Sequence, residues 1–402
     1  MSSQQRSPAS CRRRRSPSPT RPTRQQRSTK NAHATEEETN WPGQISAEIC
    51  GLRRTPSPHR PQKPMSQTEV AVLSRYISLA ALLTTTTLAT IAQAYSDDGS
   101  MATLRSVRQI MPQTPRHWVG DGFHVHPVFA NKAFTEEMSP FLMFDYAPPT
   151  IFPPNSGPPK GVGQHPHRGF ETVTIAFDGE VEHKDSNGGH DIIKKGDVQW
   201  MTAARGIVHQ EFHSKGFSER GGTFEMCQLW VNLPKKFKMT KPSYQAILDG
   251  AIPVADLTET KDGQCSDEKV GNVRVIAGSF GETKGPATTR SPVELWDVTI
   301  DRKATVDLPF PPDYNCIVFV RRGVIDVLGN DGKSREVEPQ GVALMKTDGG
   351  DRVRIIAKQK NTSLLVMGGR PLNEPIAARG PFVMNTMEEI YQANRDYHMG
   401  KF

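Results

Sequence analysis

A chain of 402 residues is long enough for two or three ordinary domains, and 36% hydrophobic residues with 33 glycines and 32 prolines are typical of a globular body with many turns. The net charge is +7, but residues 1–34 carry nine basic and no acidic side chains, so the rest of the chain is slightly acidic. We therefore expect no direct nucleic acid binding by the folded body.

Residues 1–100 are predicted to form a disordered, low-complexity extension. Its first part, up to about residue 68, consists largely of arginine, serine and proline and cannot bury enough apolar surface to offset the entropy of ordering. An arginine-rich tail of this kind serves in nuclear import or nucleic-acid contact, or is simply a solvated extension. A start codon chosen too early would also produce it.

A weak apolar segment follows at residues 70–94. From Ile77 to Ala94 it is marginal in length for a membrane helix, so we expect no stable membrane insertion. Its end, Ala92-Gln93-Ala94, matches a signal-peptidase site, which would be meaningful if translation began at Met65. Met101 is a third possible start, directly before the body. The extension therefore leaves a targeting signal possible and the true start open.

The five cysteines are scattered and form no CxxC pair. A sparse, odd set of this kind is typical of free thiols in a reducing compartment. We therefore expect an intracellular protein, located in the nucleus, the cytoplasm or both. A monomer is expected as well.

Residues 104–245 are predicted to form one β-barrel or sandwich. Apolar Val173, Ile175 and Phe177 alternate with smaller or polar residues, which is the period of a strand. Asp178-Gly179 then marks a tight turn, and further short strands and glycine turns follow at regular spacing.

Residues 270–402 repeat this texture after a polar link at about 250–270. Arg322-Gly323 occupies the place of the earlier Asp178-Gly179 turn, which indicates an internal duplication. No histidine lies between Tyr314 and Gly369, so this second copy is expected to be metal-free. Near the end, Thr386 and Glu389 form a capping-box pattern that predicts a short helix from about Met387 to Asp396, packed on the outside of a barrel.

Two pairs of metal-binding side chains stand out in the first copy: His165 with His167, and His209 with Glu211. Side chains two apart on a strand point to the same face, so each pair can aim at one point. Three imidazoles and one carboxylate suit Fe(II), Mn(II), Ni(II) or Zn(II) and leave octahedral positions open for substrate or dioxygen.

Other histidines and one acid lie near these two pairs in the sequence. His213 is interpreted as a spare or outer residue, and Glu171 as a ligand or an acceptor that fixes an imidazole, its direction being open. His183 and His190 lie by turns and are predicted to be surface residues. His124 and His126 form another HxH without a second pair, which is more typical of an ordinary strand.

Four blocks of this chain, in order, resemble the pirin family of the cupin superfamily. They are HPHRGFETVT (165–174), GDVQWMTAARGIVHQE (196–211), QLWVNLP (228–234) and PLNEPIAARGPFVMNTMEEI (371–390), with MSPFLMFD (138–145) as a further match. The resemblance covers about 104–402. It implies an all-β bicupin, two stacked cupin-type barrels, with iron in the N-terminal barrel. The iron ligands that it implies are His165, His167, His209 and Glu211.

The resemblance implies two functions that the sequence does not separate. One is a quercetin (flavonol) 2,3-dioxygenase that uses O₂ at an Fe(II) site, with Glu211 as general base. The other is a non-enzymatic, redox-sensitive nuclear protein that modulates transcription factors. The extra N-terminal residues depart from the family pattern and leave the cellular location of the protein open. The physiological substrate and the identity of the metal are also open.

Overall fold

The computed structural model describes residues 103–130, 138–347 and 349–402. The arginine-rich tail and the apolar segment 70–94 lie outside these ranges, so what the sequence predicts for them stays a prediction. Among the described residues, no helix combines the length and apolar character needed to cross a membrane.

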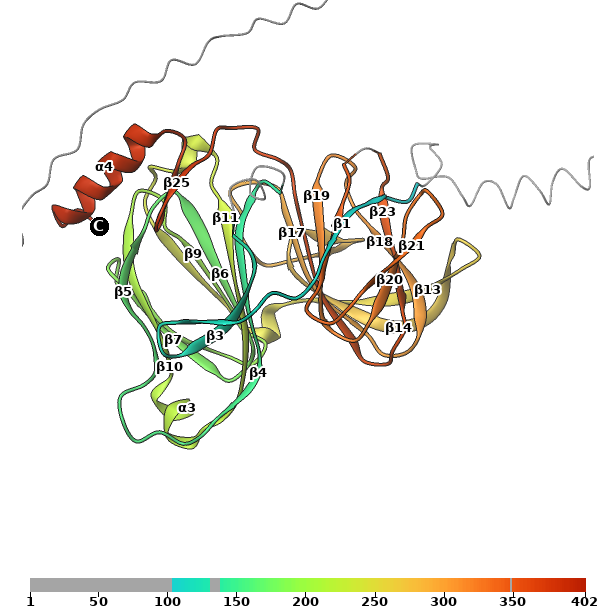
Figure 1. The fold of residues 1–402 in the computed structure, drawn as a ribbon, viewed down its shortest axis with the longest axis horizontal. Helices are drawn as coiled ribbons and strands as arrows, with labels where there is room; N and C mark the ends of the chain where they lie inside the picture. The colour runs from blue at the N-terminus through green and yellow to red at the C-terminus, as the bar shows by residue number, and fades with distance from the viewer. Residues whose placement is uncertain (1–102, 131–137, 348) are drawn as a thin grey trace, which may run out of the picture. The chain divides into compact units, whose positions relative to one another are not determined.

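The first barrel contains strands from the first half of the body (Figure 1). These are β2 (His117–Val119), β3 (Phe123–Phe129), β4 (Phe141–Phe152), β5 (Gly161–His167), β6 (Phe170–Asp178), β7 (Glu180–Asp185), β8 (His190–Lys194), β9 (Val198–Thr202), β10 (Ile207–His213), β11 (Gly222–Asn232) and β12 (Ser243–Ile247). A seven-stranded sheet in the order β12-β9-β6-β11-β4-β3-β2 faces a four-stranded sheet, β5-β10-β7-β8. Short helices α3 (Lys215–Arg220), η1 (Lys235–Phe237) and η2 (Asp249–Ala251) lie in the connections.

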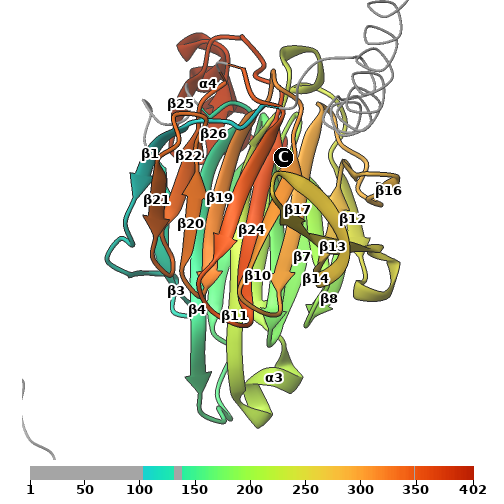
Figure 2. The same ribbon diagram turned by 90° about the vertical axis from the view of Figure 1, so that its right-hand side faces the viewer.

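The second barrel is shown face-on in Figure 2. Its strands are β1 (Val107–Met111), β13 (Val254–Lys261), β14 (Gln264–Ala277), β17 (Val293–Ile300), β18 (Ala304–Pro309), β19 (Asn315–Arg322), β20 (Ile325–Leu328), β21 (Ser334–Val337), β22 (Val342–Met345), β23 (Arg352–Ala357) and β24 (Thr362–Gly369). The large sheet runs β1-β22-β19-β24-β17-β14-β13 and the small one β18-β23-β20-β21. A small hairpin of β15 (Ser279–Phe280) and β16 (Thr283–Lys284) lies between β14 and β17. A second hairpin, of β25 (Ala377–Arg379) and β26 (Phe382–Met384), follows β24 and leads into helix α4 (Met387–His398).

The two barrels have matching strand orders. Strands β4 to β11, taken in chain order, correspond one by one to strands β17 to β24. Corresponding strands occupy the same position in the sheets of their barrels. This is the internal duplication that the repeated strand–turn pattern predicted. The all-β bicupin architecture expected from the sequence is therefore confirmed.

The barrels do not follow the segment limits expected from the sequence. Strand β1, placed by the sequence in the 104–245 unit, pairs with β22 of the second barrel, where it takes the edge position that β12 takes in the first. The supposed link at 250–270 forms most of the β13–β14 hairpin. Partner choice at a sheet edge is set by tertiary contacts, so local alternation did not reveal it.

The chain end also crosses between the barrels. Helix α4 begins with the predicted capping box, in which the Thr386 hydroxyl accepts from the backbone N–H of Glu389 and the Glu389 carboxylate accepts from that of Thr386. The helix runs to His398, one half-turn beyond the prediction. Its Asp396 bonds to Arg168 of the first barrel, so the segment after β24 reaches back to the barrel that holds the paired histidines.

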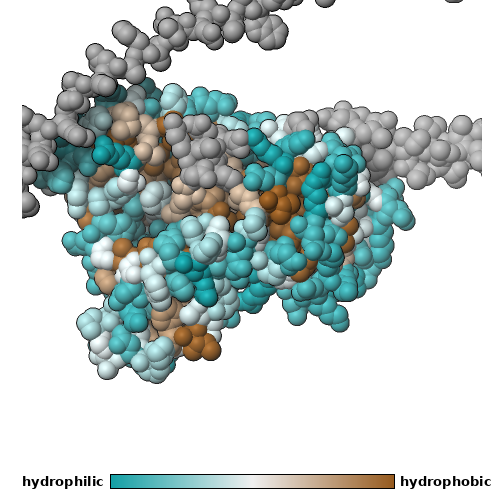
Figure 3. All heavy atoms as spheres, in the orientation of Figure 1, coloured by the Kyte–Doolittle hydropathy of each residue, from teal (hydrophilic) through white to brown (hydrophobic). Residues whose placement is uncertain are grey.

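One hydrophobic cluster is shared by the two barrels and joins them. It contains Phe144 and Tyr146 from β4 and Phe319 from β19, with ring centroids 4.9 and 5.0 Å apart from that of Phe319. Hydrophilic residues cover most of the described surface visible in Figure 3. The apolar side chains of the large sheets thus stabilise the contact between barrels, as expected for stacked sheets.

Candidate metal centre

The two predicted ligand pairs lie on neighbouring antiparallel strands. His165 on β5 is directly opposite His209 on β10, and His167 is opposite Ile207. Along β10 the residues alternate between buried and half-buried, and His209 and Glu211 are on the buried side. Strand alternation and this register together bring the two pairs to one face, as the sequence predicted.

Three of the four predicted ligands form a compact group. The ligand atoms of His165, His167 and His209 all lie within 4.8 Å of one another. The Nδ1 atom of His165 is 2.8 Å from the carbonyl oxygen of Gly163, and that of His167 is 3.4 Å from the carbonyl oxygen of Pro381. An Nδ1–H donated to a carbonyl leaves Nε2 with its lone pair. The Nε2 atoms of His167 and His209 are buried and have no hydrogen-bond partner.

Burial disfavours the charged form of two of these imidazoles, those of His167 and His209. Loss of solvent lowers the pKa of His167 to about 3 and holds the pKa of His209 well below its usual value, with the neighbouring histidines adding to both effects. A divalent metal ion requires the neutral, unprotonated ring nitrogen as its ligand. The His167 and His209 rings therefore fit an ion that replaces the missing partners of their Nε2 atoms, with His165 beside them as a third donor.

Glu211 lies beside this group and shares His209 with it. Its carboxylate forms a second close set with His183 and His209, again within 4.8 Å, and it lines a small cavity together with His165. The Thr174 hydroxyl and the Gln199 amide donate to its Oε1 at 3.2 and 3.3 Å. Glu211 is 3% exposed, so these bonds fix a buried carboxylate next to the three imidazoles.

His183 is part of this site, and its interpretation as a surface residue is wrong. Its side chain is 0% exposed and lies on β7 directly opposite Glu211. The signal for this was present, because His183 follows Val181 at a spacing of two and Val181 faces the interior. Its neighbour by the next turn, His190, does have the expected exposed side chain.

The other candidate residues near the two pairs lie outside both groups of possible metal ligands. His213 points into an aromatic cluster and its Nε2 bonds to the carbonyl of Gly122 at 3.0 Å. Glu171 accepts from the Thr202 hydroxyl at 2.7 Å, and burial raises its pKa to about 7. His124 stacks on Trp118, and His126 contacts Gln113 and Thr114.

The segment after β24 holds the far side of His167. Its Pro381 carbonyl accepts from His167, and the carbonyl of Val383 would be 1.9 Å from a Cβ atom placed on Gly169. Only glycine permits so close an approach. The buried Lys238 ammonium donates to the carbonyls of Gly169 and Val383 at 2.7 and 3.0 Å, which ties the segment to the first barrel.

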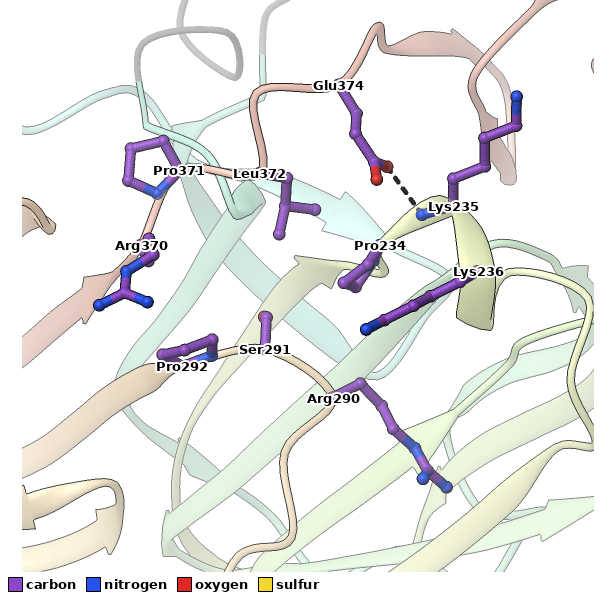
Figure 4. A pocket seen from close by; sticks show the side chains of 10 residues that line it. All are labelled: Pro234, Lys235, Lys236, Arg290, Ser291, Pro292, Arg370, Pro371, Leu372 and Glu374. Carbon is purple, nitrogen blue, oxygen red and sulfur yellow. Dashed lines mark hydrogen bonds between the residues drawn. The ribbon is translucent and has the colours of Figure 1, made fainter.

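The described part of the chain has a small cavity at the metal-binding residues and a larger one away from them. The cavity that His165 and Glu211 line has a volume of about 50 Å³, enough for a water- or dioxygen-sized molecule. A larger hollow of about 610 Å³ lies elsewhere, between the loop at Arg290–Pro292, η1 and the segment 370–374 (Figure 4). In that hollow the Arg290 and Lys235 side chains point away from its centre, and Glu374 bonds to the Lys235 backbone N–H.

Two protein-family profiles match the two barrels of this chain. A family profile described as Pirin matches residues 122–231, and one described as the Pirin C-terminal cupin domain matches residues 295–402. The chain belongs to the pirin family. As a pirin it has the bicupin fold that the four sequence blocks implied.

Several relatives are similar over most of the body. A protein of Pseudomonas aeruginosa, provisionally named a quercetin 2,3-dioxygenase, is 47% identical over 299 residues, which are 74% of this chain and 99% of the relative. Human pirin is 35% identical over 268 residues, 66% of this chain and 83% of that one. The crystal structure of a quercetin 2,3-dioxygenase from Acinetobacter baumannii superposes with a TM-score of 0.68 at 45% identity, covering 74% of this chain and 98% of that one.

The donor set and these relatives support a divalent metal ion in the first barrel. The nuclear location, the transcription-factor partners and the monomeric state expected from the sequence stay predictions.

Proposed function

We propose that this pirin binds Fe(II) through His165, His167, His209 and Glu211 and acts as a quercetin 2,3-dioxygenase on a flavonol and O₂. The observation that carries the proposal is the set of three imidazoles whose ligand atoms lie within 4.8 Å, two of them with buried, unpartnered Nε2 atoms. The names of the relatives in Pseudomonas and Acinetobacter support the reaction and the substrate class.

In the proposed reaction the metal ion and the Glu211 side chain have different roles. Bound Fe(II) supplies a redox-active centre with open positions, through which a flavonol and O₂ can react. Glu211 accepts the proton of a flavonol hydroxyl at its carboxylate, as general base. Its Oε1 is held by Thr174 and Gln199, so the remaining carboxylate oxygen would bind the ion and would accept that proton once loosened from it, or through a water.

Substrate size adds a condition to this proposal. A cavity of about 50 Å³ holds O₂ but not a flavonol, because ligands of that size occupy pockets of roughly 300 Å³ or more. Flavonol binding therefore requires side chains around the cavity, such as Val119, Phe123 and Met226, to move apart.

The test is an O₂-uptake assay with quercetin on the full chain loaded anaerobically with Fe(II), beside elemental analysis of protein expressed without added metal. We expect quercetin-dependent O₂ uptake in the wild-type protein and in His190→Ala, whose ring is at the surface, and none in His209→Ala. Metal-free protein that takes up no iron would refute the metal site. Iron-loaded protein without quercetin-dependent uptake would refute the reaction alone.

A further inference from the structure

We propose that His183 and Asp185 are a positioning pair that selects the tautomer of His209 and so leaves the Nε2 atom of His209 free for the metal ion. The proposal rests on the function proposed above, because it assigns a task within the same metal centre. Neither residue belongs to the four ligands that the sequence predicts.

The chain of hydrogen bonds begins at Asp185. Its Oδ2 lies 3.0 Å from the Nε2 atom of His183, and the two side chains are 1% and 0% exposed. A carboxylate only accepts hydrogen bonds, so the Nε2 atom of His183 carries a hydrogen, and the Gln199 amide group that faces its Nδ1 atom only donates, which leaves a lone pair there. The other oxygen, Oδ1, accepts from the backbone N–H groups of Asn187 and Gly189 at 2.7 and 3.0 Å, which fixes the carboxylate in place.

The lone pair on His183 faces the predicted ligands. The Nδ1 atom of His209 is 3.5 Å from the Nδ1 atom of His183, the only partner that a ring nitrogen of His209 has in the described structure. Two lone pairs facing each other would repel, so the hydrogen of His209 belongs on its Nδ1 atom. Its Nε2 atom is then bare, and this is the atom found buried without a partner.

Gln199 extends the same unit to the carboxylate of the site. Its Nε2 atom is 3.2 Å from the Nδ1 atom of His183 and 3.3 Å from Oε1 of Glu211. The two amide hydrogens can therefore bond to His183 and Glu211 at once. Groups that bond to the far side of metal ligands commonly change metal affinity by about 10- to 100-fold when they are lost.

The sharpest variant is Asp185→Asn, which changes one atom. The side-chain oxygen can keep the two backbone N–H bonds, and the new NH₂ group then donates to the Nε2 atom of His183. The hydrogen of His183 must move to Nδ1, where it opposes the hydrogens of Gln199 and His209. Asp178→Asn is the matched control, since Asp178 caps the neighbouring turn by accepting from the Gly179 N–H and lies outside both groups of possible metal ligands.

The first measurement is the tautomer itself, by imidazole nitrogen NMR on the metal-free full chain labelled with ¹⁵N-histidine. We expect His183 in the Nε2–H form and His209 in the Nδ1–H form, and we expect His183 to switch in Asp185→Asn. His209 found in the Nε2–H form in the wild-type protein would overturn the proposal, whether or not the protein binds metal.

The second measurement is Ni²⁺ affinity by competition with a chelator. We expect Asp185→Asn to bind about 10- to 100-fold more weakly than the wild-type protein and Asp178→Asn to bind like it, with similar melting temperatures for the metal-free proteins. Equal affinity of Asp185→Asn would overturn the positioning role while the metal site stands. In the nitrogen NMR spectrum, a Ni²⁺-induced change of the signal from the Nδ1 atom of His183 would instead make His183 a ligand and also overturn the proposal.

Discussion

The two barrels have the same strand order, but their small sheets carry different side chains toward the interior, metal-binding ones in the first barrel and aliphatic ones in the second. In the first barrel, β5 carries half-buried His165 and buried His167, and β10 carries His209 and Glu211 on its buried side. The strands in the equivalent places of the second barrel are β18 and β23, and their buried residues are aliphatic: Ala304, Val306, Leu308, Val353, Ile355 and Ala357.

This difference separates what the fold needs from what the chemistry needs. The second barrel shows that the architecture forms with aliphatic buried residues at these strands, so the strand arrangement itself does not call for histidines there. Buried imidazoles without partners for Nε2 carry a desolvation cost that an aliphatic side chain does not. Their presence in the first barrel is therefore best explained by a ligand, which agrees with the view that function resides in sites placed on a common fold.

The largest effect is expected when the first interior is made like the second. His209→Val gives β10 an aliphatic residue of similar volume, removes a member of both ligand groups and abolishes quercetin-dependent turnover. We expect Ni²⁺ affinity to fall by more than about 100-fold, beyond the range for groups outside the ligand set. The metal-free variant should melt at the same temperature as the wild-type protein or higher, because a buried unpartnered nitrogen is gone.

His190→Val is the control for this substitution, since its ring is exposed and should affect neither quantity. A clear drop in the melting temperature of metal-free His209→Val would mean that the first interior depends on its histidines for stability. The contrast between the barrels would then fail.

Glu211→Gln should show the next largest effect, on turnover. The amide keeps an oxygen that can accept from Thr174 but is no longer a base, so we expect turnover to fall by about 10²- to 10⁴-fold. Metal binding should weaken less than in His209→Val, because three imidazoles remain. Steady-state O₂ uptake with matched iron content measures this. Glu171→Gln is the control, because Glu171 is equally buried but lies outside both ligand groups, and equal losses in the two variants would exclude a special role for Glu211.

In the second barrel the expected effect is on stability alone. Ile355→Ala leaves a cavity in a fully buried aliphatic cluster and should lower the free energy of unfolding by about 2–5 kcal/mol. Ni²⁺ affinity of the folded variant should equal that of the wild-type protein. Urea unfolding and chelator competition measure the two quantities, with the exposed Ile151→Ala as control. A loss of Ni²⁺ affinity would show that the second barrel shapes the metal centre.

The barrels also show what a single sequence reveals and what it conceals. The proximity of His165, His167, His209 and Glu211 could be predicted because strand alternation places each pair on one face, and the β5–β10 register then brings the pairs together. His183 was missed because a histidine near a glycine turn is more often exposed, although its spacing of two from Val181 indicated the interior face that the pairing of β7 with β10 then gives it. Likewise the capping box located helix α4, but nothing in its own sequence indicates that its partner is Arg168 in the other barrel.

The smallest effect concerns that crossing contact and depends on pH. Asp396 bonds to Arg168 at 2.9 Å, and this bond, aided by Lys401 and Gln392, lowers the pKa of Asp396 to about 2. The folded pKa is below the value of about 4 for an unfolded aspartate, so the bond stabilises the protein above about pH 4 and is lost as the pH falls through about 2. Asp396→Asn should therefore lower the free energy of unfolding by about 1 kcal/mol at neutral pH, a modest value because solvent reaches one side of the pair.

Thermal unfolding of the wild-type protein and Asp396→Asn over this pH range measures the effect, with the exposed Asp313→Asn as control. The difference between wild type and Asp396→Asn should be largest at neutral pH and should shrink toward pH 2, whereas Asp313→Asn should match the wild type throughout. Because Arg168 follows His167 directly, a neutral-pH loss of Ni²⁺ affinity that accompanies the loss of stability would show that the segment after β24 also holds the metal centre in shape. Unchanged affinity would confine its role to joining the two barrels.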